Sequence, residues 1–272
     1  MATVTHNSAD VGFISSGTSL TFVVAVAAGS NLAGSIGVSW RDSAVSADPG
    51  ILSSITVNGV SATFLQMVNS GGGVTEQWYS KGLTAGDNTV IITWTGESGG
   101  DPDIVAVGGM EVMNDVDQTT PIGQMNLNNG VSTTPTVNVA GCTTGSMVVD
   151  NEINTETNTV ITCTVGPNQT QRWNLRVGSA GTGRTRGAAS TEPVPSAGTI
   201  TMSWTLSASR AWAICATEFL ATSTPPAPTV HLGGYTSYDI NRFDVSDPVN
   251  EPLPEVAHAV ARGDLRHIQR ST

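Results

Sequence analysis

Short alternating runs of β-branched residues, bounded by Gly, Asn, Asp and Pro, constrain this chain more than any other feature. The clearest run covers residues 89–95, where Val90, Ile92 and Trp94 fall on one side and Ile91 falls with the threonines on the other. Successive side chains of a β-strand point to opposite faces, so this run predicts a half-buried antiparallel strand. Similar runs recur to about residue 220. The pattern predicts an all-β protein.

The composition excludes the helical alternatives. Charged residues make up only 12% of the chain and Lys81 is its one lysine, whereas ordinary soluble domains carry about 25% charged residues. Long helices need Glu, Lys, Arg, Leu and Ala to cover their solvated faces, and these residues are scarce here. Coiled coils, helical bundles and helical repeats are therefore excluded.

The formal net charge of −11 argues against nucleic-acid binding, because neutralising phosphates requires clustered Lys and Arg. One short stretch does hold four arginines, which are Arg172, Arg176, Arg184 and Arg186. We interpret this stretch as a solvated loop. The alternative is a basic patch that meets an acidic partner surface.

An internal repeat organises the first 222 residues. Residues 197–205 repeat the pattern of the run that contains Trp94, with Ile200, Met202 and Trp204 on the inward side. Residues 34–38, 56–71 and 105–112 match residues 145–149, 164–181 and 212–219 at offsets of roughly 107 to 111. We therefore expect two tandem antiparallel β-sandwich domains, jelly-roll or Ig-like, over residues 1–117 and 118–222.

Aromatic residues at matched places in the two copies are expected to anchor the two cores. These pairs are Trp94 with Trp204 and Phe64 with Trp173.

The composition changes after residue 222. Residues 223–229 are rich in Pro and cannot continue a central strand, so they predict an extended spacer. Residues 223–272 are expected to form a C-terminal arm with a possible short helix over residues 254–270, ordered against another surface. The predicted anchors of this arm are Tyr235, Tyr238, Phe243, Val256, Val260 and Leu265.

The cysteine spacings and the hydropathy indicate where the chain is made. Cys142, Cys163 and Cys215 match no metal or redox signature and are expected to be reduced structural thiols. The chain opens with polar, uncharged residues, which predicts synthesis in a cytoplasm without a secretory signal. The most apolar run, residues 20–28, is too short to cross a bilayer, so no membrane insertion is expected.

No catalytic or cofactor motif emerges from the sequence. The string Gly-x-Ser-x-Gly is absent, and so are phosphate-binding loops and dinucleotide fingerprints. The four histidines, His6, His231, His258 and His267, lie outside the two predicted sandwich cores and read as surface residues. The sequence therefore predicts a protein that is not an enzyme, with no catalytic residue, cofactor or metal site.

Clustered acids leave two alternatives to that prediction. Glu97, Asp101 and Asp103 could bind calcium or act as a carboxylate pair, and Asp115 with Asp117 could form such a pair too.

Three further features each have a functional and a structural interpretation. The repeat places Glu111 and Glu218 at the same position in the two copies; we interpret them as inherited strand-end acids, with a shared ligand contact as the alternative. The tripeptide 262–264 spells an adhesion motif, which we interpret as a chance string. Trp40, Trp78, Tyr79 and Trp212 are not all needed for the core, and Trp40 and Trp78 could form an exposed platform for a glycan.

The whole pattern resembles the virion proteins of tailed bacteriophages, namely head decoration proteins, head fibres and tail-associated sandwiches. The resemblance covers about residues 10 to 220 and lies in the Lys-poor, Thr/Ser/Gly/Asn-rich tandem of β-sandwiches. It implies a non-enzymatic virion structural protein, such as a capsid decoration, fibre or collar-like component. Its expected partners are copies of itself and other virion proteins such as the major capsid protein, held through sandwich edges and the arm.

Two other functions remain open at this point. The chain could be a glycan-binding adsorption module that uses Trp40 and Trp78 on a cell-surface glycan. A glycan-cleaving enzyme ranks last.

Overall fold

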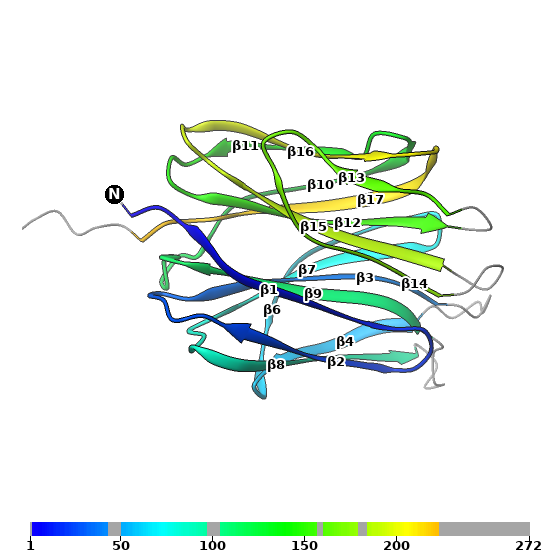
Figure 1. Cartoon of the computed structure of the whole chain (residues 1–272), viewed down its shortest axis with the longest axis horizontal. Helices are drawn as coiled ribbons and strands as arrows, with labels where there is room; N and C mark the ends of the chain where they lie inside the picture. Colours follow the sequence, from blue (N-terminus) through cyan, green and yellow to red (C-terminus); the bar gives the residue numbers. More distant parts are fainter. Residues whose placement is uncertain (1, 43–49, 97–103, 157–159, 179–183, 223–272) are drawn as a thin grey trace, which may run out of the picture. The chain divides into compact units, whose positions relative to one another are not determined.

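Seventeen β-strands and no helix make up the described residues, which are 2–42, 50–96, 104–156, 160–178 and 184–222 (Figure 1). This computed structural model divides the chain into two compact units, Met1–Thr224 and Pro225–Thr272. Neighbouring strands pair antiparallel in every sheet, so the all-β prediction is confirmed. The predicted arm, its helix and its six anchor residues lie outside the described residues.

Strands from the first half of the chain form two sheets that pack as a sandwich. The larger sheet contains, in spatial order, β1 (Thr5–Ile14), β9 (Ile104–Asn114), β3 (Ala33–Asp42), β7 (Gly73–Lys81) and β6 (Thr63–Ser70). The smaller sheet contains β2 (Ser19–Val26), β8 (Gly86–Gly96), β4 (Gly50–Val57) and β5 (Val60–Ser61).

The second half repeats this arrangement. Its larger sheet contains β10 (Ile122–Ser132), β17 (Arg210–Phe219), β12 (Met147–Glu156), β15 (Arg184–Pro193) and β14 (Thr170–Val177). Its smaller sheet contains β11 (Thr136–Cys142), β16 (Gly198–Leu206) and β13 (Cys163–Val165).

The strand order identifies both sandwiches as jelly rolls. In an immunoglobulin-like sandwich the first two strands are neighbours in one sheet, whereas here β1 and β2 lie in different sheets, as do β10 and β11. The chain wraps so that β1, β9, β3 and β7 are neighbours in one sheet and β2, β8, β4 and β5 in the other. This is the double-sheet order of a jelly roll, and β10 to β17 follow it with one strand fewer in the smaller sheet.

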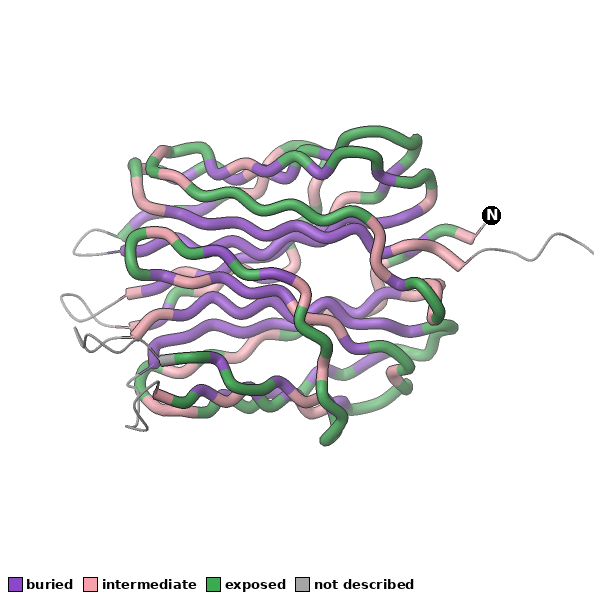
Figure 2. The backbone as a smooth tube through the Cα atoms, turned by 180° about the vertical axis from the view of Figure 1, so that it is seen from behind, coloured by how far each residue is buried: buried purple, intermediate pink, exposed green. Residues whose placement is uncertain are grey.

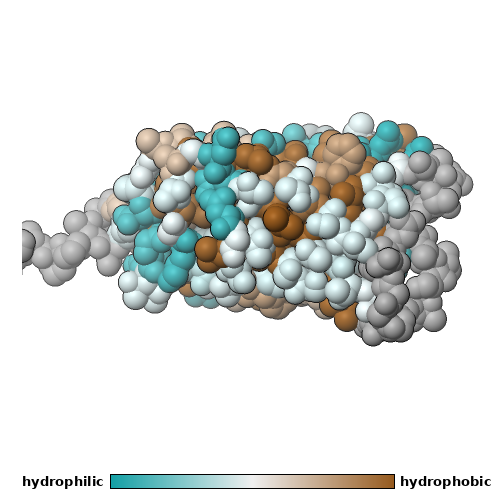
Figure 3. Space-filling view, turned by 90° about the horizontal axis from the view of Figure 1, so that it is seen from below, coloured by the Kyte–Doolittle hydropathy of each residue, from teal (hydrophilic) through white to brown (hydrophobic). Residues whose placement is uncertain are grey.

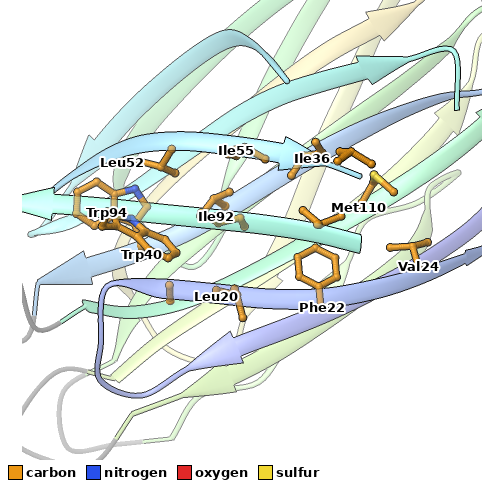
Figure 4. Close-up of a cluster of buried hydrophobic side chains, with 14 of the residues drawn as sticks. Leu20, Phe22, Val24, Ile36, Trp40, Leu52, Ile55, Ile92, Trp94 and Met110 are labelled. Carbon is orange, nitrogen blue, oxygen red and sulfur yellow. The ribbon is translucent and has the colours of Figure 1, made fainter. Parts of the chain in front are cut away.

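The alternating pattern of the clearest predicted strand matches its burial. Val90, Ile92 and Trp94 of β8 are all buried in the core of the first sandwich, while Ile91 is exposed. Figure 4 shows this core, in which the ring of Trp94 meets Trp40 edge to face at 6.5 Å between centroids. In the second sandwich Ile200, Met202 and Trp204 of β16 are buried in the same way. The predicted anchoring by Trp94 and Trp204 is confirmed.

The two larger sheets pack face to face, so the described residues form four β-layers (Figure 1). β3 lies over β15 and β7 over β12; β9 lies over β14 and β6 over β17. Each contact of one half therefore has a counterpart in the other, as an approximate two-fold axis between the halves requires. Figure 2 shows the result: the inner strands β3, β9, β12, β15 and β17 of the two central sheets are buried along most of their length, whereas the edge strands β1 and β10 are not.

Polar side chains and glycines fill the interface between the central sheets. Gln77 donates to the carbonyl oxygen of Val149 at 3.0 Å, and Gln66 donates to that of Ala216 at 2.9 Å. A Cβ atom at Gly37 would lie 2.5 Å from the Asn151 side chain, so glycine is required for this close approach. The two sandwiches are thus joined by buried hydrogen bonds as well as by apolar contacts.

The predicted repeat is correct for the smaller sheets but slips by one residue in the larger ones. The match of Ile36 with Met147 pairs a residue in the first sandwich core with one at the central interface. The match of Phe64 with Trp173 also fails: Trp173 is buried at the central interface, whereas Phe64 is 48% exposed, so the predicted core anchor at Phe64 is wrong. A shift of one residue moves a strand's side chains to the opposite face.

Candidate functional site: a buried polar row in the second sandwich

The interior of the second sandwich contains a row of polar side chains along β12. Asp150, Glu152 and Asn154 all point into this core and are fully buried. On the corresponding strand β3 of the first sandwich, the inward residues are Ile36, Val38 and Trp40. The same fold therefore has an apolar strand in one core and an acidic strand in the other. Burying a carboxyl group is costly unless hydrogen bonds hold it, so its partners decide its chemistry.

Asp150 lies among four hydrogen-bond donors, of which Gln169 Nε2 is the most distant at 3.4 Å. Trp204 Nε1 donates to it at 2.8 Å, and Ser190 donates through its backbone N–H at 2.6 Å and its hydroxyl at 2.9 Å. Burial raises the pKa of Asp150 to about 7, although these bonds act to lower it. This carboxyl can therefore exchange a proton near neutral pH.

Glu152 is the next acid in the row. Asn154 Nδ2 lies 3.2 and 3.1 Å from its two oxygens, and the Cys163 thiol lies 3.9 Å away. Burial raises the pKa of Glu152 to about 8, and the nearby Asp150 charge raises it further. Glu152 is thus mainly protonated at pH 7.

Arginines surround the acid at the end of the row. Glu156 is fully buried, with Arg186 Nε at 3.3 Å and Arg176 Nη1 at 3.7 Å. Arg186 also donates to the Asn174 side chain at 2.6 Å and to the carbonyl oxygen of Ile161 at 3.0 Å. Strands β14 and β15 carry all four arginines of the predicted loop, so the loop interpretation is wrong.

Two acids predicted to be equivalent lie on opposite faces of their sheets. Glu111 points into the central interface, where Trp173 Nε1 donates to it, and burial raises its pKa to about 8. Glu218 points to the other face, where it accepts hydrogen bonds from Ser146 Oγ at 2.6 Å and from the Gln124 N–H at 2.9 Å. Their predicted correspondence is wrong because β9 and β17 are offset by one residue in the sequence match.

The expected aromatic platform is not exposed as a unit. Trp40 is only 4% exposed, and its Nε1 donates to Glu76 at 3.1 Å, so its predicted exposure is wrong. Trp78 is half-buried and donates to the other oxygen of Glu76 at 3.0 Å. Phe64 stands edge to face on Trp78 at 5.1 Å between centroids, which places an exposed ring at this edge.

The remaining acidic candidates separate into two groups. Glu97, Asp101 and Asp103 lie outside the described residues. Asp117 Oδ1 accepts the N–H groups of Thr119 and Thr120, and Asp115 Oδ1 accepts the Ser30 hydroxyl at 2.5 Å. Asp115 and Asp117 thus hold the backbone between the two sandwiches.

The described part of the chain has neither a metal-binding cluster nor a membrane-spanning helix. No group of three or more His, Cys, Asp and Glu side chains among these residues is arranged to hold a metal ion. None of their secondary structure is a helix long and apolar enough to cross a membrane. The three cysteines are buried and unpaired.

Chemically, the polar row can hold protons near neutral pH inside a folded core. Sequence reasoning missed it because polar residues that alternate along a strand normally indicate a solvated face. Comparisons with protein-family models, with curated proteins and with solved structures gave no match.

Proposed function

We propose that this chain is a non-enzymatic structural protein of a tailed-phage particle, a capsid decoration, fibre or collar-like component held by its residues 223–272. The observation that carries the proposal is the jelly-roll order of both halves, because this fold builds many viral capsid domains. The sequence resemblance to phage virion proteins supports the same class. The central interface also joins the halves into one body able to present a fixed surface.

Two edge strands of the central sheets, β10 and β1, have hydrogen-bonding groups that are already occupied, which favours residues 223–272 over these edges as the segment that holds the chain in an assembly. On edge strand β10, Asn126 and Asn128 each accept the N–H of the following residue at 2.9 Å. Their amide groups also donate to carbonyl oxygens of β11 at 2.7 and 2.8 Å. On edge strand β1, Asp10 Oδ1 accepts the N–H of Val11 in the same way at 2.8 Å. Occupied edge groups are poor templates for an added strand.

Deletion of residues 223–272 is expected to abolish incorporation into particles while the sandwiches stay folded, because strands β1 to β17 close their sheets without these residues. Sedimentation of particles with immunodetection measures incorporation, and thermal unfolding checks the fold. A full-length chain with Tyr235, Tyr238 and Phe243 changed to Ser keeps the length and charge and should also fail to incorporate. Normal incorporation of the shortened chain would contradict the proposal.

The alternative function is glycan binding for adsorption, and one observation favours it. The exposed Phe64 ring beside Trp78 offers an apolar face of the kind that carries sugar rings. Figure 3 shows the outer face of the first sandwich's smaller sheet, where apolar side chains gather near the middle. Val23, Ile51 and Ile91 of this sheet are exposed.

Phe64→Ala is expected to abolish glycan binding if this alternative holds, with little change in stability because the ring is half exposed. A glycan array followed by calorimetry on the best ligand measures the effect. Phe13→Ala is the matched control, since Phe13 is an exposed ring on another edge. An equal loss in both variants, or no loss in Phe64→Ala, would remove this alternative.

A further inference from the structure

We propose that the arginines at the open end of the polar row, Arg176, Arg184 and Arg186, form a binding site for an oxyanion such as sulfate, phosphate or carboxylate. The site lies in the second sandwich, where β12 ends and β15 begins. It goes beyond the structural role proposed above and does not depend on it.

Strand register places the three arginines on one face around Glu156. Arg184 is the direct cross-strand partner of Glu156, and Arg176 is that of Arg186. Side chains two residues apart on a strand share a face, so Arg184 points to the same side as Arg186. Arg186 and Arg176 both reach Glu156, at 3.3 and 3.7 Å. The register thus places Arg184 on the same side of the sheet as the two arginines that reach Glu156.

The charges at this point are unbalanced. Glu156 forms ion pairs with both Arg186 and Arg176, so one carboxylate serves two arginines and Arg184 adds a third positive charge. The next acid along the row, Glu152, is bound by Asn154 and is mainly protonated at pH 7. The adjoining segments 157–159 and 179–183 contain only Thr, Asn, Ser, Ala and Gly. A positive site results, in a chain whose formal net charge is −11.

Unused donors at this site point to a ligand. Arg184 Nε is buried and has no hydrogen-bond partner among the described residues, and the Arg176 side chain is 35% exposed. A guanidinium offers parallel N–H groups that match two oxygens of sulfate, phosphate or carboxylate. Arg172, the fourth arginine of this stretch, is not part of the site, because it donates instead to Thr191 at 2.8 Å.

Titration calorimetry with sodium sulfate, sodium phosphate and sodium acetate, each against sodium chloride at equal ionic strength, tests the proposal. We expect saturable binding of at least one oxyanion; comparison of the three salts distinguishes tetrahedral anions from carboxylates. The double variant Arg176→Gln/Arg184→Gln should weaken binding at least about tenfold, since each charge-assisted hydrogen bond contributes about that factor. Arg186 is left intact because its bonds to Asn174 and Ile161 hold the fold.

Lys81→Gln is the matched charge control, because Lys81 is exposed and lies on β7 of the first sandwich. It should bind the oxyanion as the unchanged protein does, and thermal unfolding should show all variants folded. Three results would overturn the proposal: no saturable binding, unchanged affinity in the double variant, or equal weakening in Lys81→Gln.

Discussion

Raising the pH from 6.5 to 8 is expected to lower the free energy of unfolding by about 4 kcal/mol and the melting temperature by about 10 °C. Three buried carboxyls cause this loss: burial raises the pKa of Glu111 and Glu152 to about 8 and that of Asp150 to about 7. In the unfolded chain these groups return to pKa values near 4.5 for Glu and 3.8 for Asp.

The sign follows from proton counting. Between the unfolded and folded pKa values the native state binds a proton that the unfolded state has released, so stability falls as the pH rises and levels off above pH 8. Each group contributes about 1.4 kcal/mol per pH unit within its window. His6 acts in the opposite direction at lower pH, because burial lowers its pKa to about 4 and the unfolded chain then binds the extra proton up to about pH 6.5. The carboxyl groups therefore dominate the range from pH 6.5 to 8.

Glu152→Gln is expected to remove about 1.6 kcal/mol of this loss, since the amide does not titrate. Melting curves at half-unit pH steps measure the slope. Asp87→Asn, which changes an exposed carboxyl on β8, should leave it unchanged. A flat melting temperature in the unchanged protein, or parallel curves for Glu152→Gln and the unchanged protein, would contradict the assignment.

Trp204→Phe is expected to destabilise the protein by about 1–3 kcal/mol more than Trp94→Phe. The two tryptophans occupy matching strands and are each 1% exposed, so both variants lose similar buried surface. Trp204 Nε1 donates to Asp150 at 2.8 Å, whereas Trp94 Nε1 finds no hydrogen-bond partner in the described part of the chain. Only the change at Trp204 removes a hydrogen bond from a buried carboxyl group.

Urea unfolding of the two variants measures this difference, and the pH dependence gives a second readout. Removing the Trp204 bond should raise the pKa of Asp150 further, since that bond acts to lower it. The Trp204→Phe protein should then lose stability with pH over a wider range than the Trp94→Phe protein. Equal costs for the two variants would show that the Trp204–Asp150 bond contributes nothing net.

How far the sequence predicted this fold depends on how many faces of each sheet are buried. The smaller sheets have one solvated face, so β8 and β16 show clean alternation, and the inward places of Trp94 and Trp204 were predictable from it. The larger sheets are buried on both faces, and β9 and β12 are buried along nearly their whole length. Without alternation the register could not be read, and the match of Glu111 with Glu218 slipped to the wrong face.

The polar row was hidden for a related reason. Asp150 and Glu152 alternate along their strand, a pattern that normally indicates a solvated face, and only the covering strands β13 and β16 show that they face a core. Arg176, Arg184 and Arg186 were noticed as a cluster, but the separation of Arg172 from them required the three-dimensional register. In both cases the sequence gives the types of residue present. The residues that contact them lie on strands distant in sequence, so these contacts could not be predicted.

Light scattering at several concentrations, on the full chain beside a chain ending at Thr222, tests the proposed assembly role most directly. The proposal predicts that the full chain assembles with increasing concentration, while the shortened chain is a folded monomer. The shortened chain should stay monomeric because Asp10, Asn126 and Asn128 accept backbone N–H groups of the edge strands β1 and β10. The same monomeric mass for both chains at every concentration would contradict assembly through residues 223–272.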